Sequence, residues 1–335
     1  MQTTGSCQII AEAGVNHNGS PELAFKLVDA AIDAGADIVK FQTFKADKLV
    51  SPDAAKAAYQ QRATGSDSQY AMLKALELDD SVFIELMEYC ARREIGFLST
   101  PFDAESARFL ADAGMRAFKI SSGDLNNLPF LRAIGAFGLP VILSSGMATL
   151  AELDEAVAAL EKTGLTLDQL TLLHCTAEYP APLEEVNLRA MATIQAAFPQ
   201  ARVGYSDHTV GISIPIAATA LGAKVIEKHF TLDRSMDGPD HRASLEPGEL
   251  KQMVAGIRAV TTALGDGRKR PTASELPNRK AARKSIVAAR DIEAGEILDE
   301  HNLTTRRPGD GLSPMRWDEI VGRPAPRRLR PNEKL

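Results

Sequence analysis

The sequence lacks the features that mark secreted and membrane proteins: paired cysteines, a long apolar run, and a basic start followed by an apolar segment. Its only cysteines are Cys7, Cys90 and Cys175, without the spacing of a disulfide framework or a zinc knuckle, so we interpret them as buried thiols. No apolar run reaches the roughly 20 residues that span a bilayer. We therefore expect a soluble, cytoplasmic protein that does not enter a membrane.

The chain also lacks an even distribution of charge. Residues 268–335 contain 16 Lys and Arg against 10 Asp and Glu, a net charge of +6, whereas residues 1–267 contain 22 against 34, a net charge of −12. The basic residues of the tail are interrupted by prolines and acids and have no interleaved aromatics, which argues against nucleic-acid binding. An acidic partner subunit or an anionic substrate is the expected partner of the tail.

The body of the chain contains a regular alternation of strand and helix patterns. Apolar, β-rich runs occur at residues 8–12, 37–42, 96–100, 117–120, 140–144, 170–174, 202–206 and 224–228. Helical spacing occurs at residues 21–34, 80–93, 104–113, 150–162, 188–198, 212–221 and 247–264. Parallel strands that alternate with helices in this way predict an α/β fold, a closed (β/α)8 TIM barrel.

Two stretches interrupt the alternation. Residues 45–76 are too polar and irregular for one crossover helix, so we predict an extended loop at the catalytic face, a candidate lid. Residues 268–284 break the helical pattern with Gly, Pro and Asn and are predicted to be a linker. Short strand-like pieces over residues 285–335 predict a second, small unit that leans on a barrel, because it buries little core of its own. The first domain is therefore assigned to residues 1–267.

Polar residues cluster where the predicted strands end, which is the edge of the sheet at which α/β enzymes keep their chemistry. Lys40, Lys119 and Lys228 stand at such positions, with serines and threonines beside them. Ammonium groups, hydroxyls and Gly-flanked backbone amides suit a small polyanion. Because burying cations in a barrel mouth is costly without an anion, we predict that the three lysines surround a phosphate- or carboxylate-bearing ligand.

Two histidines, His208 and His229, end the seventh and eighth predicted strands. Their imidazoles are expected to project into one pocket and to bind a divalent metal ion, since two protein ligands leave positions open for water and substrate. The neighbouring residues expected in the same cavity are Ser206, Asp207, Glu227 and Lys228. Glu12 ends the first predicted strand and is expected at the same edge of the sheet.

Nine short motifs, in this order along the chain, carry a resemblance to a known family. They are AEAGVNHNG (11–19), VKFQTF (39–44), STPFD (99–103), KISSG (119–123), SSGM (144–147), HCTAEYP (174–180), GYSDHT (204–209), EKHFT (227–231) and GPDH (238–241). Together they resemble the sialic acid synthases, the bacterial nonulosonic acid synthases. Residues 285–335, with RPGDGLS at 307–313, resemble the antifreeze-like (SAF, β-clip) domain of that family.

The resemblance implies condensation of phosphoenolpyruvate with an N-acylated mannosamine-type sugar and release of phosphate. The sugar would be N-acetylmannosamine, giving N-acetylneuraminate, or 2,4-diacetamido-2,4,6-trideoxymannose, giving N,N'-diacetyllegionaminate. Manganese is the metal expected on His208 and His229, with magnesium or cobalt as alternatives. The implied ligands of phosphoenolpyruvate are Lys40, Thr100, Lys119, Ser122, Ser145 and Ser206. The residues implied to face the sugar are Glu12, Gln42, Tyr179, Glu227 and Asp240. In this reaction Glu12 and Glu227 are the candidate catalytic carboxylates, and either could handle water and protons. Arg307 would reach the N-acyl group from the SAF domain of the other subunit in a domain-swapped homodimer.

One position departs from the family pattern. Ala177 occupies a slot near the expected phosphate, and its methyl group cannot donate a hydrogen bond. A neighbour or water must take over, or the pocket is tuned to another sugar. The segment TAEYPAP at 176–182 is more similar to the legionaminate synthases.

Two other classes of function remain open. A Schiff-base aldolase would need a desolvated, neutral lysine, which borohydride trapping with pyruvate would reveal; the clustered cations argue against it. A non-catalytic protein that binds ice or carbohydrate through its C-terminal unit would need a flat apolar or Thr-rich array. The charged tail offers none.

Overall fold

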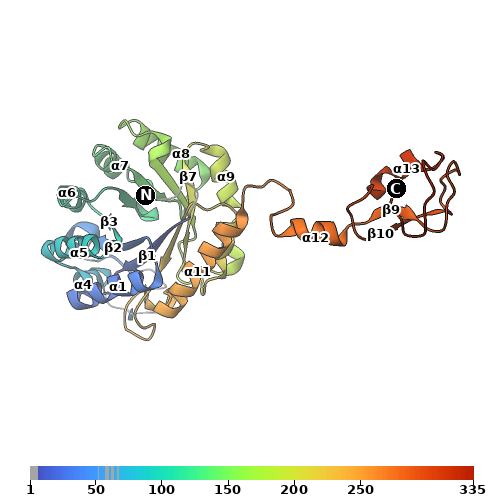
Figure 1. The fold of residues 1–335 in the computed structure, drawn as a ribbon. Coiled ribbons are helices and arrows are strands. Elements are labelled where there is room, and N and C mark those ends of the chain that lie inside the picture. Colours follow the sequence, from blue (N-terminus) through green and yellow to red (C-terminus); the bar gives the residue numbers. More distant parts are fainter. Residues whose placement is uncertain (1–6, 52, 57–59, 62–63, 66–67) are drawn as a thin grey trace. The chain divides into compact units, whose positions relative to one another are not determined.

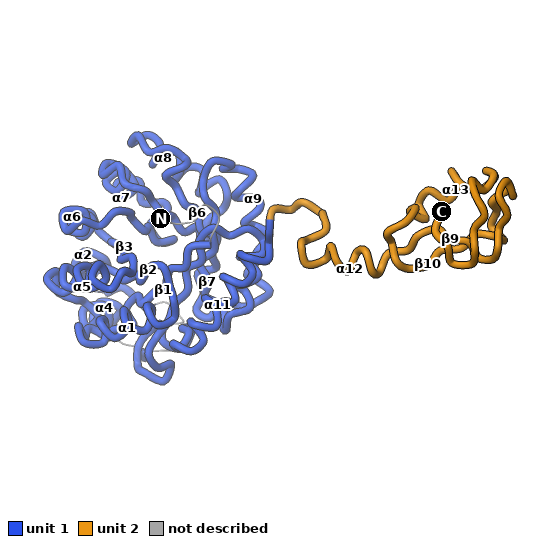
Figure 2. Tube along the Cα trace, in the orientation of Figure 1, with its two compact units in different colours: residues 1–265 blue, residues 266–335 orange. Residues whose placement is uncertain are grey.

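The computed structural model describes residues 7–51, 53–56, 60–61, 64–65 and 68–335. The chain divides into two compact units, Met1–Gly265 and Asp266–Leu335 (Figure 2). The first unit contains a parallel sheet with helices around it, and the second contains a small antiparallel sheet.

All the predicted strands of the first unit are present and form one parallel sheet. They are β1 (Gln8–Gly14), β2 (Ile38–Thr43), β3 (Gly96–Pro101), β4 (Phe118–Ile120), β5 (Val141–Ser144), β6 (Leu170–Cys175), β7 (Arg202–Asp207) and β8 (Val225–His229). Hydrogen bonds join them in the order β3-β2-β1-β8-β7-β6-β5-β4. The two ends of this order, β3 and β4, are also in contact. The sheet therefore closes into a (β/α)8 barrel, which confirms the predicted fold.

Helices cover the outside of the barrel (Figure 1). They are α1 (Pro21–Ala34), α5 (Asp80–Arg92), α6 (Ala104–Asp112), α7 (Leu128–Gly135), α8 (Leu150–Glu161), α9 (Ala190–Ala197), α10 (Ser213–Ala220) and α11 (Pro247–Leu264). The ends of α1 follow directly from its sequence, because Ser20 Oγ accepts a hydrogen bond from the N–H of Leu23 and Gly35 ends the helix at φ 82°. The sequence did not predict α7, whose 8 residues give an apolar pattern of little more than two turns.

The segment between β2 and α5 was predicted to be an extended loop, but its described part contains two short helices. They are α2 (Ala46–Leu49) and α4 (Gln69–Leu76). Leu76 and Met72 of α4 pack with Val15 and Phe44, which follow β1 and β2, so this segment is anchored at the carboxyl ends of these strands. Positions 52, 57–59, 62–63 and 66–67 of the predicted loop lie outside the described residues. Single turns of 3-10 helix occur at η1 (Ser122–Asp124), η2 (Leu167–Gln169), η3 (Leu183–Glu185), η4 (His241–Ala243) and η5 (Pro314–Arg316).

Side chains alternate along each barrel strand between the interior and the helix layer. On β2, Val39 and Phe41 are buried in the apolar core, whereas Lys40 and Gln42 line an interior cavity. The same alternation brings polar residues of neighbouring strands together at the carboxyl end of the barrel.

The second unit begins with α12 (Glu275–Ala282), within the stretch predicted to be a linker. This helix has no buried residue, which explains why an apolar period did not reveal it. β9 (Ser285–Ala288) pairs antiparallel with β10 (Leu303–Arg306), and α13 (Trp317–Ile320) follows. The small core includes Ile286, Ile292, Leu298, Leu303 and Leu329. Within the described residues, none of the helices has both the length and the apolarity needed to cross a membrane.

Candidate active site

A cavity of about 450 Å³ lies at the carboxyl ends of the barrel strands. Most of the residues that the sequence singled out line it: Glu12, Lys40, Gln42, Thr100, Lys119, Ser122, Tyr179, Ser206, His208, Glu227 and His229. They come from strands and loops that are far apart in sequence and that the barrel brings to one edge. The sequence pattern and the fold therefore place these side chains in one cavity.

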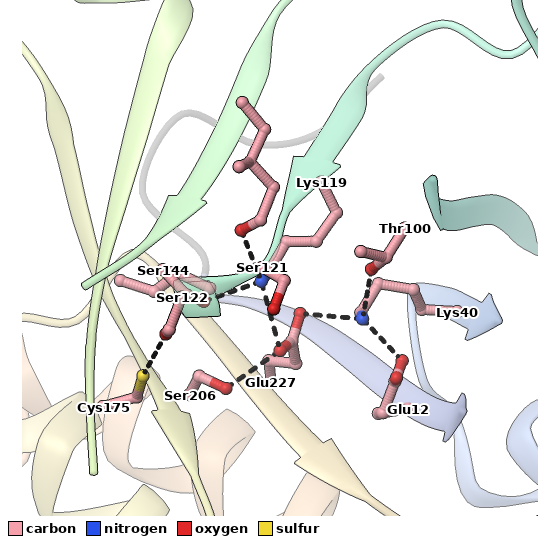
Figure 3. A network of polar contacts seen from close by, with 12 residues as sticks. Glu12, Lys40, Thr100, Lys119, Ser121, Ser122, Ser144, Cys175, Ser206 and Glu227 are labelled. Atoms are coloured by element: carbon pink, nitrogen blue, oxygen red, sulfur yellow. Dashed lines mark hydrogen bonds and ion pairs between the residues drawn. The ribbon is translucent and has the colours of Figure 1, made fainter. Parts of the chain in front are cut away.

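Two lysines and two glutamates form a buried network in the cavity wall (Figure 3). Lys40 Nζ lies 2.8 Å from Glu12 Oε2 and 3.6 Å from Glu227 Oε2. Lys119 Nζ lies 3.8 Å from Glu227 Oε1 and donates a hydrogen bond of 2.6 Å to Ser144 Oγ. The sequence predicted the lysines to be paired with a bound anion, but in the structure the glutamates already pair them. Lys119 is farther from its carboxylate partner than Lys40 is, so Lys119 is more available to an anion that enters the cavity.

This crowding gives the two carboxyl groups opposite pKa shifts. Burial and the adjacent charge of Glu227 raise the pKa of Glu12 to about 7, although Lys40 opposes them. Burial also disfavours the charged form of Glu227, but Lys119 and Lys40 outweigh it and hold the pKa of Glu227 below its usual range. Near neutral pH, Glu12 can therefore carry a proton while Glu227 stays ionised. Two carboxyl groups with diverging pKa values are suited to different roles in acid–base chemistry.

The imidazoles of His208 and His229 lie close together, with ring centroids 5.5 Å apart. His208 Nδ1 lies 2.6 Å from the backbone oxygen of Thr176, which places the proton on Nδ1 and leaves the lone pair of Nε2 free. Within the described part of the chain, the buried Nδ1 of His229 has no hydrogen-bond partner. Burial lowers the pKa of His208 to about 4 and that of His229 well below its usual range. Both rings are therefore neutral at physiological pH.

Neutral imidazoles with free lone pairs are good ligands for divalent transition metals, so these residues fit the expected metal. Among the residues that the structure describes, no group of three or more His, Cys, Asp or Glu side chains has metal-binding spacing. The chain would thus supply His208 and His229 and leave the remaining positions to water and substrate. That arrangement suits a catalytic site more than a structural one.

The structure corrects the predicted ring of three lysines. Lys228 does not line the cavity: its side chain is 0% exposed and its Nζ lies 2.6 Å from Asp207 Oδ2. It also donates to the backbone oxygen of Thr209. Lys228 and Asp207 face the layer behind the strands, because they alternate with Glu227 and His208, which face the cavity.

Two other predicted residues, Ser145 and Asp240, are also absent from the cavity wall. Ser145 donates a hydrogen bond of 2.9 Å to the backbone oxygen of Leu173 and lines a neighbouring cavity. Asp240 lies beside His229, with 3.7 Å between its Oδ2 and His229 Nδ1. Arg307, which is predicted to act from the other subunit, is exposed in the second unit, just after β10.

Sequence reasoning missed some residues of the cavity wall. Gln60 and Gln69 line it from the segment after β2, where no period in the sequence marked them. Cys175, interpreted as an ordinary buried thiol, also lines it, with its Sγ 3.2 Å from Ser122 Oγ. A second cavity of about 700 Å³ adjoins the first and shares Met147, Cys175 and Ala177 with it.

A (β/α)8 barrel with lysines, carboxylates and neutral histidines at the carboxyl ends of its strands has the arrangement of a barrel enzyme for an anionic substrate. Comparison with known proteins narrows this class. The model of the NeuB family matches residues 27–269, and that of the SAF domain matches residues 283–335. The chain belongs to the NeuB family.

Named relatives extend over nearly the whole chain. An N,N'-diacetyllegionaminic acid synthase of Campylobacter jejuni is 52% identical, covering 98% of each chain. The one from Legionella pneumophila is 48% identical, covering 95% of this chain and 90% of the relative. Among solved structures, the N-acetylneuraminic acid synthetase of Leptospira borgpetersenii is 36% identical with a TM-score of 0.72, covering 82% of this chain and 90% of its own.

Proposed function

We propose that the protein is a nonulosonic acid synthase, a transferase that joins phosphoenolpyruvate to an N-acyl amino sugar and releases phosphate. The observation that carries the proposal is the pair of buried cations, Lys40 and Lys119, set among carboxylates in the cavity that also contains His208 and His229. The 52% identity to an N,N'-diacetyllegionaminic acid synthase supports the same reaction class.

Lys119 and Lys40 would bind the phosphate and carboxylate of phosphoenolpyruvate. Charge-assisted hydrogen bonds to such groups are the strong ones in a buried site. Thr100, Ser122 and Ser206 would add hydroxyl donors from the same wall. A proton on Glu12, favoured by its raised pKa, would reduce the repulsion between the entering anion and the carboxylates.

The two glutamates would then divide the proton and charge handling. As C3 of phosphoenolpyruvate bonds to the aldehyde carbon, Glu12 would give its proton to the sugar oxygen. The ionised Glu227 would stabilise the positive charge that develops at C2. Water would add at C2 and lose a proton to Glu12; the C2–O bond to phosphate would break, and the C2 hydroxyl would give its proton to the departing phosphate. This sequence restores Glu12 to its protonated form.

We propose manganese as the metal, and when bound to His208 and His229 it would supply Lewis-acid polarisation of the sugar carbonyl. The contact between His208 Nδ1 and the Thr176 oxygen fixes the orientation of one ring. The Tyr179 ring restrains the same imidazole from the other side, with centroids 4.0 Å apart.

We propose 2,4-diacetamido-2,4,6-trideoxymannose as the sugar, giving N,N'-diacetyllegionaminate. The names of two relatives, at 52% and 48% identity, support this choice over N-acetylmannosamine. Ala177 is compatible with it, because a small side chain between the two adjoining cavities leaves room for an additional substituent.

The test is phosphate release from phosphoenolpyruvate with a panel of sugars and manganese. We expect release with the diacetamido sugar, weaker release with N-acetylmannosamine, and none with unacylated mannosamine. Absence of release with every sugar, together with borohydride trapping of pyruvate on the protein, would replace this proposal with a Schiff-base aldolase.

We further propose that the enzyme acts as a domain-swapped homodimer in which Arg307 contacts the sugar bound to the other subunit. Arg307 is exposed after β10, where its guanidinium is available to a partner. Arg307→Ala should weaken sugar binding and leave phosphoenolpyruvate binding intact. Mixing it with His229→Ala should regenerate activity, since one hybrid site would have both functional parts. Failure of proven heterodimers to recover any activity would contradict donation in trans.

A further inference from the structure

Two pieces of the sequence, NHN at 16–18 and GPDH at 238–241, do not contribute to the cavity wall. They lie in the loops that follow β1 and β8, which are neighbours in the barrel. The first loop follows the strand of Glu12, and the second contains Asp240. Contacts between the two loops therefore influence the position of the Asp240 carboxylate.

Side chains of the first loop bind the second loop on both sides of Asp240. Asn18 Nδ2 donates a hydrogen bond of 2.9 Å to the backbone oxygen of Asp237. Asn18 Oδ1 lies 3.0 Å from His241 Nε2. Because the Asn18 amide nitrogen is used by Asp237, its oxygen faces His241, and the Nε2 of His241 must be the donor. One asparagine thus fixes the residues before and after the Gly-Pro-Asp turn.

The residues of this contact are tightly packed and leave no space for a side chain at Gly238. His241 is 0% exposed, and its Nδ1 lies 2.7 Å from Thr231 Oγ1, so both ring nitrogens have partners. A Cβ at Gly238 would lie 2.6 Å from His241 Cδ2 and 3.0 Å from Asn18 Oδ1. Only glycine lets the turn close on this pair.

Asn16 adds a second attachment deeper in the barrel. Its Nδ2 donates to the backbone oxygen of Phe230 at 2.8 Å and to Ser244 Oγ at 2.9 Å. Ser244 Oγ in turn donates to the backbone oxygen of Asp240 at 2.7 Å. The backbone of Asp240 is therefore held from the β1 side through Asn16, while its flanks are held through Asn18.

The side chain of Asp240 is nearly buried. It is 7% exposed, and its Oδ2 approaches His229 Nδ1 at 3.7 Å, beyond hydrogen-bond length. The position of this carboxylate beside His229 thus depends on the backbone of the turn. A small change in the turn would move it relative to the cavity.

From this geometry we propose that Asn18, acting with His241, is a positioning residue that sets the Asp240 carboxylate beside His229 for sugar binding. The inference rests on the proposed function and on the prediction that Asp240 faces the sugar, which its position beside His229, a residue of the cavity wall, supports. Asn18 touches no reacting group. Its effect passes through Asp240 alone, which separates it from a residue that only stabilises the fold.

The test uses Asn18→Gly with Asn332→Gly as its matched control. Both asparagines have left-handed backbone angles, with φ values of 51° and 68°, which glycine adopts without strain. Asn332 is exposed in the second unit. We expect Asn18→Gly to raise the KM for the sugar about tenfold or more, since small misplacements at a site are costly, while the KM for phosphoenolpyruvate stays within about twofold. Asn332→Gly should change neither constant.

A double-mutant cycle with Asp240→Asn distinguishes positioning from general loosening. If Asn18 acts through Asp240, Asn18→Gly should have little further effect on the KM for the sugar in the Asp240→Asn background. Multiplying effects in the double variant, or an Asn18→Gly variant that behaves like the Asn332→Gly control, would overturn the proposal.

A crystal structure of the Asn18→Gly variant gives a readout that does not depend on activity. We expect the Asp240 carboxylate to move away from His229, with the barrel strands unchanged. An unmoved carboxylate would overturn the inference whatever the substrate proves to be. A wild-type protein inactive with every sugar would instead contradict the proposed function.

Discussion

Strands β7 and β8 bury charged side chains on both of their faces, and the two faces use them differently. Toward the cavity, Glu227 lies 3.8 Å from Lys119 Nζ and 3.6 Å from Lys40 Nζ. Behind the strands, Lys228 and Asp207 form an ion pair of 2.6 Å in which both side chains are 0% exposed. Burial alone therefore does not distinguish a lysine that binds a ligand from one that holds the fold. Access to the cavity does: Lys40 has a close partner, at 2.8 Å from Glu12 Oε2, but it lines the cavity, whereas Lys228 does not.

The difference has a physical reason. A buried pair at close contact has already offset much of its desolvation cost, and nothing further can approach it. A loosely paired cation in a cavity keeps donor capacity that an entering anion can use. We therefore assign the cavity-facing charges to substrate binding and the pair behind the strands to the joining of β7 to β8.

The largest expected effect tests the histidines of the cavity face. His229→Ala and His208→Ala should each lower kcat/KM by about 100-fold or more, because loss of a metal ligand exceeds the usual 10- to 100-fold effect of its supporting residues. Titration calorimetry with Mn²⁺ should show lost binding. His301→Ala, in the second unit, is the control and should bind metal normally. Undiminished Mn²⁺ affinity in both cavity variants would place the metal elsewhere.

Lys119→Met and Lys228→Met compare the two faces directly. Lys119→Met should raise the KM for phosphoenolpyruvate by roughly 30-fold or more, an effect of about 2–5 kcal/mol, with the smaller loss of stability, because Lys40 still pairs Glu227. Lys228→Met should leave that KM unchanged and lower the free energy of unfolding by about 3–5 kcal/mol, because it strands a buried Asp207 charge. Kinetics and urea denaturation of both variants give the four values needed.

A further variant sharpens this contrast. Adding Asp207→Asn to Lys228→Met should recover part of the lost stability, since it removes the stranded charge and keeps the acceptor for the N–H of Thr209. No recovery would mean that Lys228 acts through packing of its side chain. A raised KM for phosphoenolpyruvate in Lys228→Met would mean that Lys228 takes part in anion binding. The two faces of the strands would then not differ in function.

The sequence was sufficient for much of the barrel and its cavity. Apolar runs located every barrel strand, and strand ends located the cavity, because parallel strands must bring those ends to one edge. The alternation of side chains along a strand also predicts the observed position of Lys228. It stands between Glu227 and His229, so strict alternation places it on the opposite face from both.

Other features depend on contacts that no local pattern encodes. Asn18 and His241 are 223 residues apart, and nothing in either loop has a period that would pair them. Gln60 and Gln69 reach the cavity from an irregular segment. The sequence did not predict α7 or α12, because helix prediction relies on a repeated apolar face. Helix α7 is too short to show the repeat, and the exposed α12 has no apolar face.

The last expected effect concerns Glu12, whose pKa should make the cavity face respond to pH. Burial raises the pKa of Glu12 to about 7, above its ordinary value of 4.5. The folded protein therefore binds this proton more tightly than the unfolded chain does. The resulting stability is fully present below about pH 4.5 and is lost as pH rises through about 7. Between pH 5 and pH 8 we expect this group to lower the free energy of unfolding by up to about 3 kcal/mol.

Glu12→Gln should remove this dependence, because glutamine cannot ionise. Urea denaturation at constant ionic strength, from pH 5 to pH 8, should show a smaller decline for the variant than for the wild type. Circular dichroism is the appropriate probe, since the only tryptophan, Trp317, lies in the second unit. Glu85→Gln, an exposed change on α5, should keep the wild-type slope. If Glu12→Gln keeps that slope as well, Glu12 is ionised throughout this range. It could not then hold the proton that the proposed mechanism gives to the sugar oxygen, and the cavity face would be as fully charged as the pair of Lys228 and Asp207 behind it.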